Sequence, residues 1–470
     1  MLEETAMFLT GYLSNGVAWY RLLLHPLRNY PGPQLAKISD AYSTYHAMLM
    51  DLHLVTRQDN LKYGPVMRHG PNKLVFNSAR ALHDIYDNDR VNKASTYLTT
   101  LFTPYFNTLN VIDKNLHRTK RRLIGRVLSK SSMKKFEPIM MKQIDIFIEQ
   151  LMILSKNANP VNMSDRCKYV GVDSVGHLAF GYDLRLQTSP ENRHIASAFK
   201  SGNRRLNVYM HSPFLAMFKL ERGSYLRKLQ FMITSRLKEE KDAKYDLYSV
   251  LADSIDTPSG GDNLSLSELW SEALFFVPAG GVTMTTGMTA LFFFLSHNRE
   301  AHESLRSEIR TTFTAAEEIR GGPRLTGCRY LHACIDEALR LAPPMPGTLW
   351  RERAQHDEEK NRGLPLIIDG CEVPEGIIFG VNIYALHHNA DIFPDPFLFW
   401  PERWMPSEET EEDERRTAMT ESFAAFQLGP RGCAGKAMAY LEASLVVAKT
   451  LWDFDIEPAP GKLGKLGCER

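Results

Sequence analysis

The most informative stretch of the sequence is FQLGPRGCAGKAMAY, residues 426 to 440, where one cysteine stands between glycines and a helix-forming run follows. Gly432 and Gly435 permit tight turns and the close approach of a flat ligand to Cys433. A helix N-terminus lowers the pKa of a thiol, and the thiolate is the form that binds metals or acts as a nucleophile. The stretch therefore predicts a functional thiol at the tip of a turn.

Three roles fit Cys433. It can be a buried structural cysteine, or a nucleophile, although a nucleophile needs a base and no histidine lies nearby in the sequence. The third role is axial thiolate ligand to a haem iron. Only this third role accounts together for the glycines, for the cation Arg431 and for the aromatic ring of Phe426.

Composition narrows the class of protein. The chain has 470 residues, 44% of them apolar and 24% charged, with a net charge of +1. These values are typical of a globular protein and argue against a nucleic-acid binder, which needs a basic field. The six cysteines lack the pair spacing of metal sites and the density of disulfide frameworks, which indicates a reducing compartment.

Two apolar segments are candidate membrane helices. Residues 1–27 are interrupted by charged and polar residues, so they fit the end of a weak anchor and an amphipathic first helix equally well. Residues 273–295 carry no charge but contain Pro278, Gly280, Gly281 and several threonines. This pattern favours a buried, distorted helix inside a large core over a bilayer span.

The remaining chain predicts a mainly α protein with small β-sheets. A proline-rich hinge at 25–33 separates an N-terminal helix or anchor remnant (1–33) from a single domain (34–470). Residues 40–70 and 130–250 have mostly helical patterns, and short strands are predicted at 73–76, 366–368 and 377–381. Ser265 and Glu268 have the spacing of a capping box. Residues 406–416 form a charge run that predicts a solvated surface loop.

The segment FQLGPRGCAG matches the pattern Phe-x-x-Gly-x-Arg-x-Cys-x-Gly of the cytochrome P450 superfamily, the haem-thiolate monooxygenases. The resemblance extends over about residues 20 to 460 and is closest to filamentous-fungal members. It implies the P450 fold and haem b as cofactor, with its iron bound by Cys433. It also implies that Phe426 packs beside the cysteine, that Gly435 allows the haem to approach, and that Arg431 reaches a haem propionate.

A second motif supports the resemblance. EALRLAPPMP, residues 337–346, places Glu337 and Arg340 on one face of a helix, where they can pair. Alone, this spacing is common and its usual meaning is a solvent-exposed pair. In the family the pair is buried and is completed by an arginine of a later loop, here Arg403. These three residues are expected to support the haem pocket.

Further cations match family positions that bind propionates. Arg351 is the expected ligand on one side, with Arg353 as the alternative, and His117 with Arg121 on the other, because a guanidinium can make two hydrogen bonds to a carboxylate. Eight lysines and arginines lie between residues 118 and 135 without an acid. This run is either a solvated helix face or a docking surface for an acidic reductase.

The apolar helix resembles the helix that crosses the distal face of the haem in the family. The family pattern of small residues, an acid and two hydroxyls reads here as Ala279-Gly280-Gly281-Val282-Thr283-Met284. The small residues are expected to open a groove for dioxygen, and Thr283 is the predicted catalytic hydroxyl for proton relay. Val282 replaces the acid and Met284 the second hydroxyl, which leaves Thr285 or Thr286 as substitutes.

The resemblance implies a monooxygenase that oxidises an apolar small molecule with dioxygen and with electrons from NADPH, delivered by NADPH-cytochrome P450 reductase. It also implies attachment to the endoplasmic reticulum membrane and a role in secondary-metabolite biosynthesis. The pair His387–His388 is not expected to bind a metal, because no further ligands follow at useful spacing. The residues expected to line the substrate pocket are Phe102, Phe276, Ala279, Gly280, Thr348 and Leu349.

Two alternatives remain open at this point. Val282 at the acid position leaves room for a haem-thiolate isomerase or dehydratase that does not use external dioxygen. The chain also ends soon after LWDFDIEP, whereas relatives of this kind continue into a hairpin that touches the substrate pocket. That ending motivates the second alternative, a degenerate haem-binding protein without catalysis.

Overall fold

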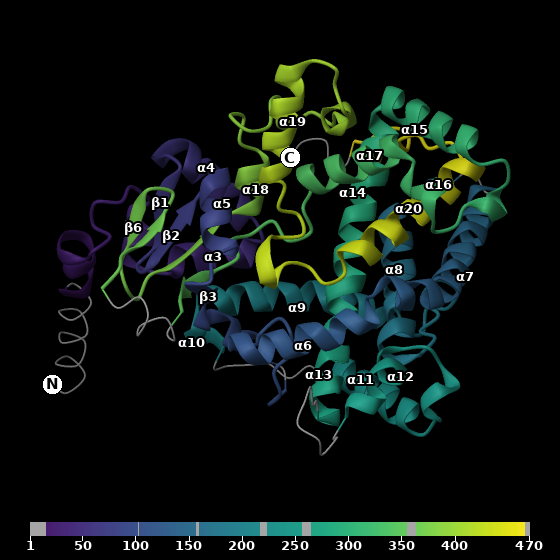
Figure 1. Cartoon of the computed structure of the whole chain (residues 1–470), viewed down its shortest axis with the longest axis horizontal. Coiled ribbons are helices and arrows are strands. Elements are labelled where there is room, and N and C mark those ends of the chain that lie inside the picture. Colours follow the sequence, from purple (N-terminus) through teal and green to yellow (C-terminus); the bar gives the residue numbers. More distant parts are fainter. Residues whose placement is uncertain are drawn as a thin grey trace.

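The computed structural model describes residues 16–101, 103–156, 159–216, 223–255, 265–354 and 363–465. Helices form most of the molecule, and a small sheet lies at the end that carries the N-terminus (Figure 1). The mainly α architecture with small β-sheets is therefore confirmed. The predicted anchor residues 1–15 and the pocket candidate Phe102 lie outside the described residues.

The helices differ widely in length. Their bounds are α2 Gln34–Ile38, α3 Ala41–Leu49, α4 Leu52–Tyr63, α5 Ala79–Tyr86, α6 Lys114–Val127, α7 Lys130–Ser155, α8 Met163–Phe180, α9 Arg193–His211, α10 Pro213–Ala216, α11 Gly223–Leu237, α12 Leu247–Leu251, α13 Leu266–Phe276, α14 Thr283–His297, α15 Arg299–Thr312, α16 Pro323–Thr326, α17 Arg329–Leu341, α18 Ile383–His387, α19 Thr410–Ser422 and α20 Lys436–Asp453.

Two sheets are present in the described part of the chain. The five-stranded sheet has the order β1-β2-β7-β4-β3, and a separate hairpin pairs β5 with β6. In the larger sheet β2 and β7 run parallel, although some 300 residues separate them, and the other pairs are antiparallel. The strands are β1 Val66–Gly70, β2 Lys73–Phe76, β3 Val91–Lys93, β4 Arg351–Arg353, β5 Leu366–Ile368, β6 Cys371–Val373 and β7 Ile378–Val381.

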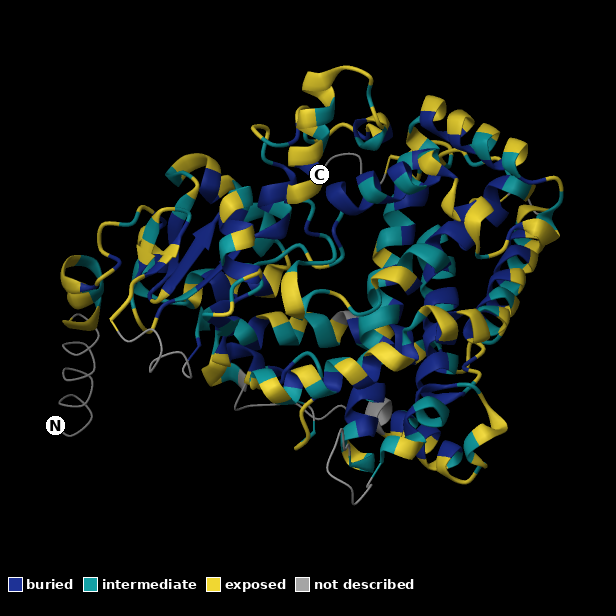
Figure 2. Cartoon of the chain, viewed as in Figure 1, coloured by how far each residue is buried: buried dark blue, intermediate teal, exposed yellow. Residues whose placement is uncertain are grey.

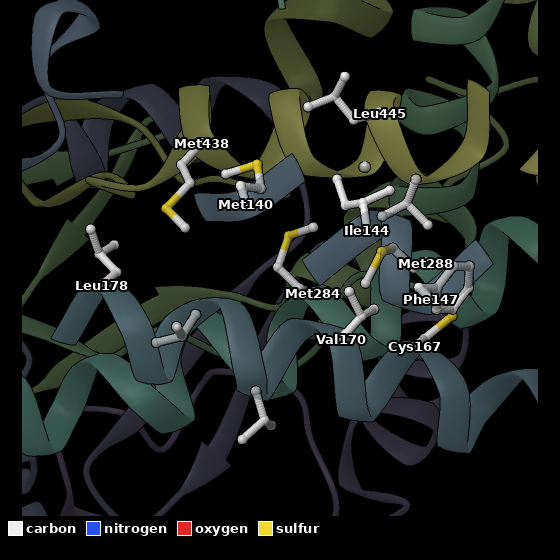
Figure 3. Packing of buried hydrophobic residues seen from close by; sticks show 14 of the residues in the cluster. Met140, Ile144, Phe147, Cys167, Val170, Leu178, Met284, Met288, Met438 and Leu445 are labelled. Carbon is white, nitrogen blue, oxygen red and sulfur yellow. The ribbon is translucent and has the colours of Figure 1, made fainter. Parts of the chain in front are cut away.

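The main core is made by helices that are distant in sequence. Side chains of α7, α8, α14 and α20 interdigitate, with Met140, Val170, Met288 and Leu445 buried among them (Figure 3). Buried residues of these helices lie where the helices pack together, and their exposed residues face outward (Figure 2). This packing fixes the start of α20, and with it the position of the cysteine turn, relative to α14.

The long apolar segment is a single distorted helix. Helices α13 and α14 are joined by the π-helical residues Val277–Val282, which gives one run from Leu266 to His297. This run is long and apolar enough to cross a membrane, by length and composition only, but its residues pack against α8, α17 and α20. A reciprocal capping box between Ser265 and Glu268 begins the helix, as predicted.

Local predictions had mixed outcomes. The strands predicted at 73–76 and 366–368 are confirmed, and the one predicted at 377–381 is observed as Ile378–Val381. The helical interpretation of 40–70 was wrong for Val66–Gly70, which form β1. Successive side chains of a strand point to opposite faces, and four of these five residues are buried. The predicted loop at 406–416 was also wrong from Thr410 onward, where the exposed helix α19 begins, with acidic residues in its first turn that favour a helix N-terminus.

Candidate active site

Cys433 lies on the turn that precedes α20. The backbone N–H of Cys433 donates to the carbonyl of Phe426 at 2.8 Å, and that of Gly432 donates to Gly429 at 3.0 Å. Cys433 is exposed, and desolvation by the surrounding atoms raises the pKa of its thiol.

Backbone N–H groups temper this effect. Those of Gly435 and Lys436, with the cations Arg121 and Lys436, act to lower the pKa of the Cys433 thiol. Gly435 is the N-cap of helix α20 and Lys436 is its first residue, so both N–H groups belong to the start of this helix. A Cβ atom at Gly435 would meet nothing within 4 Å except the sulfur itself at 3.9 Å, so space for a flat ligand is open there.

Thr283 and Phe426 share a recess. Both line a pocket between α14, α17 and α20, together with Tyr440 and apolar side chains of these helices. The Phe426 ring lies 5.2 Å from the ring of Tyr440. The structure thus brings the predicted distal hydroxyl and the aromatic residue of the cysteine turn to one site.

The threonine hydroxyls of the long helix bond to their own backbone. Thr283 Oγ1 donates to the carbonyl of Ala279 at 2.5 Å, and Thr285 Oγ1 donates to that of Gly281 at 2.6 Å. Thr286 donates to Val282 at 3.1 Å. The Thr283 hydroxyl uses its hydrogen in its bond to Ala279, but its oxygen lone pairs remain available. Thr283 can therefore accept a hydrogen bond from a water molecule while it keeps its bond to the backbone.

The glycines of this helix serve helix packing. A Cβ at Gly280 would lie 2.6 Å from Val175 Cγ2, and one at Gly281 would lie 2.9 Å from Val172 Cγ2. Their missing side chains therefore admit α8, which the sequence did not predict. An opening for dioxygen at these two glycines stays a prediction.

Five basic side chains gather beside the cysteine turn. His117 and Arg121 come from α6, Lys93 from β3, Arg351 from β4 and Arg431 from the turn itself. Burial and the neighbouring cations lower the pKa of His117 to about 3 and that of Arg431 to about 10. Among the described residues neither Arg351 nor Arg431 forms an ion pair.

This cluster calls for an anion. Buried cations that repel one another are costly unless an anionic group neutralises them. Together with a thiol in the electrostatic range of Arg121, the cluster fits a ligand that carries carboxylates at one edge and a metal at its centre. The residues present therefore fit haem.

Arg431 is already bonded to the protein. Its guanidinium donates to the carbonyls of Val111 at 2.8 Å and Ile112 at 2.6 Å, and to Asn92 Oδ1 at 3.1 Å. These bonds hold the segment before α6, and so place His117 beside the cluster. A direct bond from Arg431 to a propionate stays a prediction.

Glu337, Arg340 and Arg403 meet in the interior. Arg340 donates two hydrogen bonds to the Glu337 carboxylate, at 2.8 and 2.9 Å, and Arg403 donates a third at 3.1 Å. None of the three side chains is exposed. Trp404 Nε1 and the backbone N–H of Trp400 also donate to Glu337, so one carboxylate organises α17 and the 394–404 loop.

The pair His387–His388 makes protein contacts. His387 Nε2 accepts from the backbone N–H of Ala424 at 3.0 Å, and its ring stacks on Phe423. The ring of His388 stacks on Tyr384 at 4.0 Å. These contacts give both rings a structural role near the loop that leads to the cysteine turn.

The remaining pocket candidates are dispersed. Phe276 packs partly buried against the main core, and Ala279 lies in the π-helical segment. Thr348 bridges to Asn382, and the Leu349 carbonyl accepts from the Tyr86 hydroxyl at 2.9 Å. Their predicted contact with substrate stays a prediction.

The sequence did not reveal a buried clamp between α13 and the loop before α6. Glu272 accepts from both the N–H and the hydroxyl of Thr108, at 3.0 and 2.9 Å. Ser271 donates to the carbonyl of Tyr105 at 2.9 Å, and Lys93 Nζ donates to the carbonyl of Thr108 at 2.9 Å. The only available signal was Glu272, a charged residue directly before the apolar run 273–295.

Comparison with known proteins agrees with this geometry. The family described as Cytochrome P450 matches residues 44–466. The chain is 32% identical to cytochrome P450 monooxygenase apf7 of Gibberella fujikuroi, over 96% of this chain and 90% of the relative. It is also 32% identical to cytochrome P450 monooxygenase poxM of Penicillium oxalicum (95% and 87%) and to AKT7 of Alternaria alternata (99% and 90%). The chain therefore belongs to the cytochrome P450 family of monooxygenases.

Proposed function

We propose that the protein is a haem-dependent monooxygenase that oxidises an apolar small molecule in fungal secondary metabolism. The observation that carries the proposal is the buried cluster of His117, Arg121, Lys93, Arg351 and Arg431 beside the Cys433 thiol. The similarity to fungal monooxygenases supports it. Haem, the cofactor of the family, has carboxylates that would neutralise the cations and an iron that would bind the thiol.

Each residue then has a role. Cys433 would bind the haem iron, and Arg121, Arg351 and His117 would hold its carboxylates. Haem bound in this way supplies the chemistry that transfers one oxygen atom from dioxygen to a substrate. Phe426 would pack beside the bound sulfur, and the N–H groups of Gly435 and Lys436 would moderate its charge.

Thr283 is the proposed proton-handling residue. Its hydroxyl hydrogen is held by Ala279, which orients the oxygen lone pairs for accepting a hydrogen bond. Val282 cannot carry a proton, so water ordered by Thr283 and by the exposed Thr286 would supply it. Apolar side chains of the recess favour an apolar substrate.

Electrons are proposed to come from NADPH through a cytochrome P450 reductase. Of the eight cations between 118 and 135, Lys120 is buried against Glu268 at 3.0 Å and Arg121 faces the site. The six others are exposed, namely Arg118, Arg122, Arg126, Lys130, Lys134 and Lys135. They supply a positive surface on α6 and α7 for an acidic partner.

Association with the endoplasmic reticulum membrane is the remaining part of the proposal. Trp19 is 65% exposed and Leu24 is 70% exposed, close to the N-terminal end of the described chain. Exposed aromatic and aliphatic residues at this end suit a membrane interface. Retention in a membrane fraction by residues 1–33 would support this location.

Absorbance of the reduced protein with carbon monoxide tests the central claim. The purified protein should show the long-wavelength Soret band of a thiolate ligand, and Cys433→Ala should abolish it. Cys371→Ser is the matched control, because Cys371 lies in strand β6 and should leave the band unchanged. Absence of any haem band in the unmodified protein would contradict the proposal.

A further inference from the structure

Gln427 occupies a strained position beside the cysteine turn. Its φ angle is +58°, in the left-handed region, although it is not a glycine. A side chain makes this conformation unfavourable, and glycine would adopt it without cost. A non-glycine residue held there against strain points to a use for its side chain.

The side-chain amide of Gln427 is only half satisfied. Its Oε1 accepts a hydrogen bond from Arg351 Nη2 at 3.4 Å. Its Nε2 is buried and has no hydrogen-bond partner in the described part of the protein. The amide cannot be turned around, because Nε2 would then face the guanidinium donor. The unpartnered atom is therefore a donor, and it needs an acceptor.

Arg351 fixes the direction of the missing acceptor. Its guanidinium lies 4.8 Å from the centre of the Tyr86 ring and also donates to the carbonyl of Trp350 at 3.1 Å. No described carboxylate pairs with it. The Gln427 amide and the Arg351 guanidinium together form a neutral donor next to a charged donor, which is the arrangement that a carboxylate accepts.

The geometry points to Gln427 as a carboxylate-binding residue for the haem, which orients Arg351 through Oε1 and donates from Nε2 to the same propionate. This inference rests on the proposed function, because it needs haem in the site. The inference goes beyond the proposed function because it adds a haem-binding residue outside the defined positions of the cysteine motif. It also explains why a glutamine tolerates φ +58° at this turn.

The test compares Gln427→Gly with the unmodified holoprotein. Glycine removes both hydrogen bonds but relieves the backbone strain, so the cofactor-free protein should be as stable as before or more stable. We expect haem transfer to an excess of apomyoglobin to be about three- to tenfold faster, which corresponds to one lost hydrogen bond. The reduction potential should fall, because the propionate keeps more of its negative charge.

Two further variants make the result specific. Gln427→Glu should release haem faster still, because its carboxylate pairs with Arg351 and repels the propionate. Arg185→Gly is the matched control, because Arg185 also has a positive φ, +56°, but is exposed and distant from the cysteine turn. It should relieve the same strain without altering haem transfer or potential.

The outcomes separate this inference from the proposed function. Haem transfer at the unmodified rate in both Gln427 variants would overturn it, and so would equal acceleration by Arg185→Gly. In either case the Soret band of the carbon monoxide complex would still establish haem binding by Cys433. A protein that takes up no haem at all would instead overturn the proposed function itself.

Discussion

Arg340 and Glu337 form a two-point ion pair in which neither side chain is exposed to solvent. Arg403 completes the arrangement from a loop 66 residues further along the chain. Such a group is costly to desolvate, and it stabilises the fold only while all members are present. Its position between α17 and the 394–404 loop makes it a test of fold stability separate from catalysis.

Removal of the shared carboxylate should be severe. Glu337→Ala leaves two buried guanidinium groups without a neutralising carboxylate, so we expect the free energy of unfolding to fall by roughly 3–5 kcal/mol. Urea denaturation followed by circular dichroism measures the change. The matched control is Glu303→Ala, which removes the exposed helix pair with Arg299 and should cost less than about 1 kcal/mol. Equal losses for the two variants would contradict this account.

We expect that Gly280 cannot be replaced by a larger residue unless α8 moves away from it. Alanine at this position would place a Cβ 2.6 Å from Val175 Cγ2. Gly280→Ala should lower the free energy of unfolding by about 1 to 3 kcal/mol through overpacking. Val175→Ala should restore much of that loss in the double variant, although it is destabilising alone.

A double-mutant cycle by thermal or urea denaturation checks this coupling. Gly347→Ala is the control, because a Cβ there would meet no atom within 4 Å. Additive effects of Gly280→Ala and Val175→Ala would show that the contact between α8 and the π-helical segment does not limit substitution.

Glu442 should make stability depend on pH. It is fully buried on α20, neither carboxyl oxygen has a hydrogen-bond partner among the described residues, and burial raises its pKa to about 7. The folded protein therefore holds a proton that the unfolded chain releases near pH 4.5, so the stability that comes from the neutral acid is lost as the pH rises toward 7. Nearby Ser174 offsets part of the shift.

Comparison with Glu442→Gln isolates the contribution of Glu442 to the pH dependence of stability. The two proteins should differ least at pH 5, where both side chains are neutral, and the variant should gain about 1 to 3 kcal/mol relative to the unmodified protein by pH 8. Unfolding free energies across this range provide the measurement. Glu149→Gln, on the exposed face of α7, should show no such trend. A constant difference from pH 5 to pH 8 would mean that Glu442 does not titrate in this window.

The basic surface of α6 and α7 should control reduction and not haem binding. The double reversal Lys130→Glu, Lys134→Glu replaces two exposed cations. We expect the reductase concentration for half-maximal reduction to rise several-fold at low salt, with little difference at high salt, because the ions screen the attraction. Stopped-flow reduction at two ionic strengths is the measurement.

Lys62→Glu provides the matched reversal on α4, outside this surface. The carbon monoxide spectrum should be unchanged in both proteins. Equal slowing of reduction by Lys62→Glu would show that net charge, and not this surface, governs the encounter.

The sequence predicted best where a motif is contiguous or where two motifs confirm each other. The cysteine turn, the meeting of Glu337 with Arg340 and Arg403, and the capping box at Ser265 are all found in the structure. The four-residue strand at 73–76 was also predicted from the sequence. In each case the residues that interact, or the signal that starts an element, lie within a short stretch or in a known order.

Contacts between distant segments could not be predicted in this way. Lys93 joins the cation cluster only because β3 pairs with β4, and the clamp from Glu272 to Thr108 depends on the packing of α13 against a loop. The contact of Gly280 and Gly281 with helix α8 was likewise not predicted, because the two helices are distant in the sequence. Helix α19 was missed because charge density indicates exposure but does not separate a helix from a loop.

The π-helical residues Val277–Val282 separate the long helix into α13 and α14, which make different contacts. The wider π-helical turn rotates the side chains of α14 about the helix axis relative to those of α13. The two helices therefore do not share one continuous buried face. Changes in α13 can therefore remodel the grip on the loop at Tyr105 and Thr108 without rotating Thr283 away from the recess. As a result, the contact of α13 with this loop and the packing of Thr283 in the recess can change independently during evolution.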